Sequence, residues 1–148
     1  MADDSAPTTP ALTGGCGCGA VRYEVSEPLI AAAYCHCTIC QRRTGTAVQA
    51  SAMAAYGSIT VTAGDEHLRS WQPTPQSNAK QFCGTCGSAL FAVNADDPEI
   101  VFVRLGSVDG DPGIRPGARQ FVAYAAPWEP IPDDGLPRFD ERVQFPSS

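Results

Sequence analysis

Hydrophobic and polar residues alternate along much of this chain with a period of two, which is typical of strands with one buried face. The alternation is clear at residues 20–25 and 58–62, and residues 100–105 form a β-branched and aromatic run like that of a buried strand. Turn-forming residues bound six shorter strand candidates, at residues 29–34, 48–54, 68–71, 81–82, 89–93 and 121–124. The pattern predicts a mainly β domain of short strands.

One helical turn is expected at residues 38–44, because Gly45 can end a helix in the left-handed conformation. The aromatic residues Trp71, Phe121 and Trp128 are expected in the core. Residues 1–12 contain acidic residues and prolines but neither a basic start nor an apolar run, so they predict a disordered tail and not a signal peptide. The folded domain is then expected to span residues 13–145.

Charge narrows the range of partners. The chain of 148 residues has a formal net charge of −6, and its ten Lys and Arg residues are scattered, with only Arg42 and Arg43 adjacent. Nucleic-acid binders carry a basic patch, so this class is excluded. No stretch approaches the roughly 20 apolar residues needed to span a membrane. Without an export signal we expect a cytoplasmic protein whose thiols stay reduced, which favours metal binding over disulfides.

Seven cysteines are the strongest chemical signal. They form three groups: Cys16 and Cys18; Cys35, Cys37 and Cys40; Cys83 and Cys86. The number is odd, and Cys16 and Cys18 are too close in sequence to bridge each other comfortably, so disulfides would leave a thiol over. A closed structural zinc site uses four ligands and an open catalytic site uses three, and together these account for seven. The pattern predicts one zinc of each kind.

The segment of residues 83–87, Cys-Gly-Thr-Cys-Gly, has the form of a zinc knuckle. Its partner pair is either Cys37 with Cys40 or Cys16 with Cys18, and both choices leave three cysteines. Local spacing favours the second choice, because Cys35, Cys37 and Cys40 then remain together on one short loop. The residues alone leave both pairings open.

His36 lies between two of these cysteines. As a metal ligand it would close the three-cysteine site. In an extended stretch, however, its side chain points away from those of Cys35 and Cys37, which favours a supporting hydrogen bond or packing beneath the loop.

Four segments, at residues 14–23, 35–40, 83–88 and 126–128, resemble the glutathione-dependent formaldehyde-activating enzyme family, to which centromere protein V also belongs. The resemblance covers roughly residues 12–139. It implies a β-tent fold of short antiparallel strands built around zinc sites. It also implies a structural zinc and a catalytic zinc, with the ligand sets Cys16, Cys18, Cys83 and Cys86, and Cys35, Cys37 and Cys40, respectively.

The resemblance further implies a carbon-sulfur lyase of the S-(hydroxymethyl)glutathione synthase type, which adds or removes a small aldehyde such as formaldehyde at the thiol of glutathione. The alternatives are a lyase for another small thiol or carbonyl compound, and a non-catalytic zinc-binding interaction module. Relatives usually have a histidine where this chain has Arg119, and often an arginine where it has Gln41. The carboxylates of glutathione need arginine partners, and the candidates are Arg22, Arg42, Arg43 and Arg119.

Overall fold

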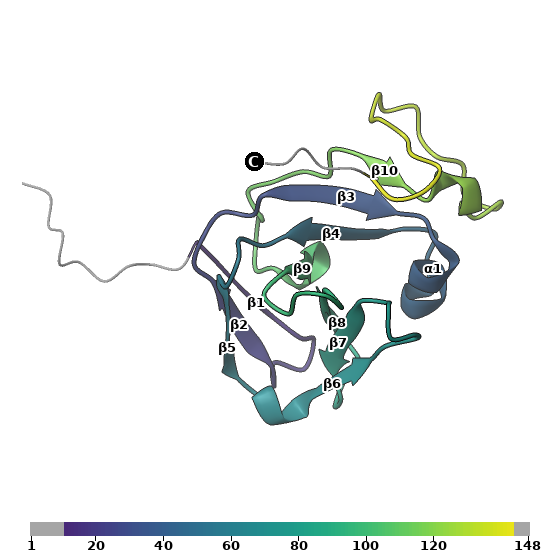
Figure 1. The fold of residues 1–148 in the computed structure, drawn as a ribbon. Helices are drawn as coiled ribbons and strands as arrows, with labels where there is room; N and C mark the ends of the chain where they lie inside the picture. Colours follow the sequence, from purple (N-terminus) through teal and green to yellow (C-terminus); the bar gives the residue numbers. More distant parts are fainter. Residues whose placement is uncertain (1–10, 144–148) are drawn as a thin grey trace, which may run out of the picture.

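The computed structural model describes residues 11–143, in which two β-sheets and one α-helix form the body of the protein (Figure 1). The smaller sheet has the strand order β1-β2-β5, and the larger has the order β10-β3-β4-β9-β8-β7-β6. The strands are β1 (Leu12–Gly15), β2 (Arg22–Val25), β3 (Ala31–Cys35), β4 (Gln49–Met53), β5 (Ile59–Ala63), β6 (Leu68–Trp71), β7 (Ala79–Cys83), β8 (Ala89–Val93), β9 (Val101–Arg104) and β10 (Arg119–Gln120). The prediction of a mainly β fold is confirmed.

The helix α1 (Thr38–Thr44) has the predicted bounds. Its N-cap is Cys37, and Gly45 ends it with φ 72°, donating its backbone N–H to the Gln41 carbonyl over 2.8 Å. Only a residue that tolerates the left-handed region fits this C-cap, which explains the glycine. The helix lies beside the ends of β3 and β4 (Figure 1).

Eight of the nine predicted strands are confirmed, and residues 121–124 are the exception. Phe121 adopts the left-handed conformation with φ 58°, and a 3-10 helix, η3 (Val122–Tyr124), follows it. The Tyr124 N–H donates to the Phe121 carbonyl over 3.1 Å, so this backbone forms turn bonds where a strand would pair. The short strand β10 directly before it was not predicted, nor was β1.

Two of the expected core aromatics lie at the surface. Trp71 is 44% exposed and Trp128 is 66% exposed, whereas Phe121 is half-buried. Trp71 belongs to β6, the edge strand of the larger sheet, so no neighbouring strand covers it on that side.

The core lies between the two sheets. Tyr23 of β2 is 1% exposed and meets Phe91 of β8 edge to face, with the ring centroids 4.9 Å apart. Its hydroxyl is 2.7 Å from the Ser107 Oγ, so the buried polar atom has a partner. A side chain at Gly14 would place its Cβ 2.3 Å from the Tyr23 ring, so the packing of β1 on β2 requires glycine there.

Strand register gives the larger sheet two different faces. Ala32, Ala52, Val103 and Phe91 are neighbours across four strands and pack into the core. The residues between them along each strand point to the opposite face, because side chains alternate. That second face carries the cavity described below.

Strand β1 begins at Leu12, one residue before the expected start of the domain. Residues 1–10 of the predicted tail lie outside the described residues, as do residues 144–148. Among the helices of the described part, none is long and apolar enough to cross a membrane.

Candidate metal centres and cavity

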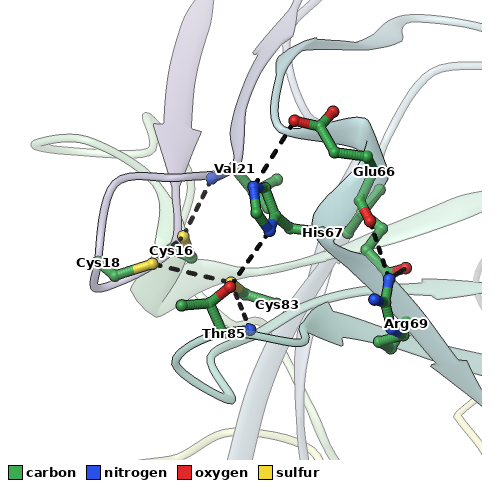
Figure 2. A network of polar contacts seen from close by, with 9 residues as sticks. Cys16, Cys18, Val21, Glu66, His67, Arg69, Cys83 and Thr85 are labelled. Carbon is green, nitrogen blue, oxygen red and sulfur yellow. Dashed lines mark hydrogen bonds and ion pairs between the residues drawn. The ribbon is translucent and has the colours of Figure 1, made fainter.

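Four cysteines from two hairpins meet at the junction of the sheets. Cys16 and Cys18 lie in the turn between β1 and β2, while Cys83 ends β7 and Cys86 lies in the turn before β8. All four sulfurs lie within 4.8 Å of one another. The Cys16 and Cys18 sulfurs are 3.6 Å apart, and those of Cys18 and Cys83 are 3.8 Å apart (Figure 2).

This arrangement fits a tetrahedral metal ion. Zn–S bonds of ~2.3 Å at tetrahedral angles separate the sulfurs by about 3.8 Å. Backbone N–H groups also point at the sulfurs: Val21 donates to Cys16 over 3.2 Å, and Thr85 donates to Cys83 over 3.4 Å (Figure 2). A hydrogen bond from Ser88 lowers the pKa of Cys86 to about 5. The group can hold a metal ion and would then join the smaller sheet to the larger one.

The other three cysteines come from one continuous segment. Cys35 ends β3, Cys37 caps α1, and Cys40 lies within the helix, where it is 9% exposed. Their sulfurs also lie within 4.8 Å of one another, and within residues 11–143 no fourth Cys, His, Asp or Glu joins the group. All seven cysteines of the chain are free thiols. The structure thus divides them four and three, and each group can hold a metal ion.

Crowding of the three sulfurs shifts their ionisation in opposite directions. Hydrogen bonds from the Cys35 and Cys40 thiols, and then from the backbone N–H groups of Cys40 and Ile39, hold the pKa of Cys37 well below its usual range. The contact with Cys37 raises the pKa of Cys35, and the contacts with Cys35 and then Cys37 raise the pKa of Cys40. Without a cation only one of the three is readily ionised, so binding of a metal ion by all three thiolates would release protons and would strengthen as the pH rises.

His36 does not belong to the three-sulfur group. Its side chain is buried, and its Nε2 is 3.2 Å from an Nη1 of Arg119. Burial, together with the charges of Arg119 and Arg138, lowers the pKa of His36, so the ring is neutral at pH 7 and its Nε2 can accept this bond. The prediction that His36 supports the loop and is not a ligand agrees with this position.

Arg119 is a structural residue and does not reach the cavity. It is 5% exposed, its guanidinium lies 4.3 Å from the centre of the Tyr34 ring, and its Nη2 donates to Asp134 over 2.8 Å. Its strand, β10, pairs in parallel with β3, which places Gln120 opposite Cys35. The contacts of Arg119 therefore hold the residues around Cys35 and Cys37 against the C-terminal segment.

We expect Arg119→Met to lower the free energy of unfolding by about 1–3 kcal/mol, because it removes charge-assisted hydrogen bonds and leaves the buried His36 Nε2 unpaired. Thermal unfolding followed by circular dichroism measures this. The matched control is Arg115→Met, whose ion pair with Asp111 is exposed and which should leave the unfolding temperature unchanged. Equal effects of the two changes would contradict the role given to Arg119.

A cavity of about 480 Å³ opens next to the three-sulfur group. It lies on the second face of the larger sheet. The strand residues that line it are Ala31, Ala33, Cys35, Ser51, Met53, Lys80, Ala92, Phe102, Arg104 and Gln120. Cys37 and Cys40 complete one end, and Phe121, Arg142 and Val143 line the side formed by the C-terminal segment. A small molecule in the cavity can approach the three sulfurs directly.

None of the four arginines expected to hold a substrate lines this cavity. Arg22 pairs with Asp109, Arg119 is buried as described, and Arg42 and Arg43 line a separate hollow beside Trp71 on the outer side of α1. The guanidinium of Arg43 lies 4.9 Å from the centre of the Phe82 ring, so it packs on an aromatic face. The sequence named these arginines only as candidates, because it does not show which side chains border a cavity.

The cations that do line the cavity are Lys80, Arg104 and Arg142. A signal for Arg104 was present in the sequence. It lies two residues after Phe102 in the strand predicted at residues 100–105, and this spacing puts both side chains on one face. What the sequence lacked was the register that places this face beside the cysteines.

Comparison with known proteins agrees with this arrangement. Residues 11–124 match the family described as glutathione-dependent formaldehyde-activating enzyme. The matched stretch contains all seven cysteines and every strand that lines the cavity. The chain belongs to this family, as the resemblance of its cysteine motifs predicted.

Two relatives illustrate the range of similarity. A protein of Halomonas elongata, provisionally named as a glutathione-dependent formaldehyde-activating enzyme, is 30% identical over 105 residues, which cover 68% of this chain and 67% of the relative. A crystal structure of a Rhodobacter sphaeroides protein is similar with a TM-score of 0.58 and 27% identity, covering 86% of this chain and 98% of the other.

Proposed function

We propose that this protein is a zinc-dependent carbon-sulfur lyase that catalyses the reversible addition of a thiol such as glutathione to a small aldehyde such as formaldehyde. The observation that carries the proposal is the three-sulfur group of Cys35, Cys37 and Cys40, which opens onto a cavity and has no fourth side-chain ligand within residues 11–143. Family membership supports the choice of thiol and aldehyde.

The reaction is balanced without a further reagent. The thiol sulfur donates an electron pair to the carbonyl carbon, forming the C–S bond as the C=O π bond breaks. The oxygen takes up the proton that the thiol has lost, so glutathione and formaldehyde give S-(hydroxymethyl)glutathione. The reverse reaction cleaves the C–S bond.

In this proposal the two cysteine groups have different roles. Cys16, Cys18, Cys83 and Cys86 would hold a structural zinc, and Cys35, Cys37 and Cys40 would hold a catalytic one. The catalytic zinc, when bound, supplies a Lewis acid that lowers the pKa of a substrate thiol from about 8.5. Three thiolates give that site a net charge of −1 with zinc, which favours thiol chemistry over the activation of water.

The residues of the chain would orient the sulfur and limit access of water. Phe102 of β9 and Phe121 at the start of η3 line the cavity with apolar surface. The short backbone N–H contact from Cys40 to the Cys37 sulfur, 3.2 Å, fixes one of the three ligands before any ion binds. The free thiols suit a reducing compartment, and we place the activity in the cytoplasm.

The proposal is tested by metal analysis of the purified chain together with an NMR assay that follows S-(hydroxymethyl)glutathione in a mixture of glutathione and formaldehyde. We expect two zinc ions per chain and an exchange rate above that of the uncatalysed addition, which is measured in parallel and subtracted. Two bound zinc ions with no gain in rate for glutathione or for other small thiols would retain the metal sites and reject the lyase, leaving the non-catalytic zinc-binding module.

A further inference from the structure

The floor of the cavity is made of small side chains with two cations among them. Across the larger sheet, Ala33 of β3, Ser51 of β4 and Arg104 of β9 are direct neighbours. Two residues along, a second row runs from Ala31 through Met53, Phe102 and Ala92 to Lys80. Because these rows share one face, the alanines and the serine leave space over the sheet, and Arg104 and Lys80 border that space.

Arg104 is held in place but is not neutralised. Its Nη1 donates to the Ser51 Oγ over 2.7 Å, while its Nε is buried and has no hydrogen-bond partner. Lys80 has only a backbone carbonyl, that of Asn78, at 2.9 Å from its Nζ. Both side chains line the cavity together with Cys35, Cys37 and Cys40, which places both cations near the three-sulfur group.

Charge within the cavity is unbalanced. No Asp or Glu of the described residues lines it, although the chain has 16 of them. None of the ion pairs between residues 11 and 143 includes Arg104 or Lys80. Arg142 also lines the cavity, so three thiolates with one zinc, which contribute a charge of −1, offset only one of three cations. A half-buried cation without a counter-charge is costly, so the cavity is complementary to an anion.

We propose that Arg104 and Lys80 bind a carboxylate of the thiol substrate, with its sulfur directed to Cys35, Cys37 and Cys40. This inference rests on the proposed function and narrows it to thiols that carry a carboxylate, which include glutathione and smaller mercapto acids. The guanidinium group of Arg104 has planar N–H donors in the geometry that a carboxylate accepts. Its Nη1 is held by the Ser51 Oγ, and its Nε has no hydrogen-bond partner.

The test compares two small thiols that differ in the carboxylate, 3-mercaptopropionate and 2-mercaptoethanol, on the full chain loaded with Co²⁺. Binding of each thiol is followed through the sulfur-to-cobalt charge-transfer absorption, independently of turnover. In Arg104→Gln we expect the dissociation constant of 3-mercaptopropionate to rise about 10- to 100-fold, because a hydrogen bond to a charged group is lost. That of 2-mercaptoethanol should change less than about twofold. The control variant is Arg115→Gln, at an exposed ion pair, and it should change neither.

Three outcomes would overturn the subsite. If Arg104→Gln weakens the binding of both thiols equally, Arg104 only offsets the charge of the metal group. A lower cobalt content in Arg104→Gln would lead to the same conclusion. If the unmodified protein binds both thiols with equal affinity, the cavity does not recognise the carboxylate. If Arg104→Gln does not fold, Lys80→Gln serves instead, with the same expected preference. If neither thiol alters the cobalt spectrum of the unmodified protein, the proposed function itself is rejected.

Discussion

Cys83→Ser is expected to prevent the domain from folding stably. Cys83 is fully buried at the end of β7, its sulfur lies 3.8 Å from that of Cys18, and it receives a backbone N–H from Thr85. Structural zinc contributes roughly 10–16 kcal/mol in small zinc-binding domains, whereas a domain of this size has a net stability of about 5–15 kcal/mol. Loss of one of four ligands therefore removes an energy comparable to the whole stability.

The measurements are the yield of soluble protein, its circular dichroism and its zinc content. The variant should be aggregated or lack the cooperative thermal transition of the unmodified chain, with less than one zinc retained. Chelation of zinc from the unmodified protein should have the same consequence. A variant that folds with two bound zinc ions and an unchanged unfolding temperature would show that this four-sulfur group is not a structural metal site.

Cys37→Ser is expected to abolish activity while the fold survives. Cys37 caps α1, and its sulfur accepts the N–H of Cys40 over 3.2 Å. Serine is a good N-cap, so the helix should persist, with a loss of unfolding free energy of no more than about 3 kcal/mol. The hydroxyl is a poor replacement for a thiolate ligand, so the site should lose its metal and the NMR exchange rate should fall to the uncatalysed background.

The paired comparison with Cys83→Ser separates the two sites, since both variants replace one sulfur by one oxygen. Cys37→Ser should retain one zinc and a cooperative transition, and added zinc should not restore activity. Equal destabilisation by both changes would contradict the division into a structural and a catalytic site. Activity retained in Cys37→Ser would reject the three-sulfur group as the catalytic centre.

Much of this architecture could be predicted because local patterns determine it. The alternation of residues 20–25 and 58–62 reflects strands with one face on the core, and these became β2 and β5. The spacing of Cys35, Cys37 and Cys40 brings three sulfurs together through one strand end and one helical turn, with no contribution from distant chain. The helix bounds followed from Gly45, whose backbone conformation ends α1.

What could not be predicted depends on contacts between distant parts of the chain. Sequence spacing allowed two partners for Cys83 and Cys86, and only the approach of two hairpins from different sheets brings Cys16 and Cys18 to them. The aromatic stretch after Gln120 has strand propensity, but it lies beyond the last pairing of β10 with β3, so it turns instead.

The position of Arg119 also depends on contacts between distant parts of the chain. In the sequence it was a candidate to hold a substrate, and in the structure its pairing with Asp134 and its contact with His36 turn it away from the cavity. Arg104 and Lys80 instead lie beside the cavity, because five neighbouring strands align them with Ala31 and Ala33. The register of the sheet therefore determines which positively charged side chains line the cavity.

The parallel pairing of β10 with β3 has a consequence for biosynthesis. All seven cysteines and the strands of the cavity floor precede Leu105, whereas Gln120, Phe121, Arg142 and Val143, which line the remaining side, are translated last. Because the chain is synthesised from its N-terminal end, the four-sulfur group can assemble while one side of the cavity is still missing. We therefore expect the part of the fold that holds the cysteines to form before the cavity is enclosed.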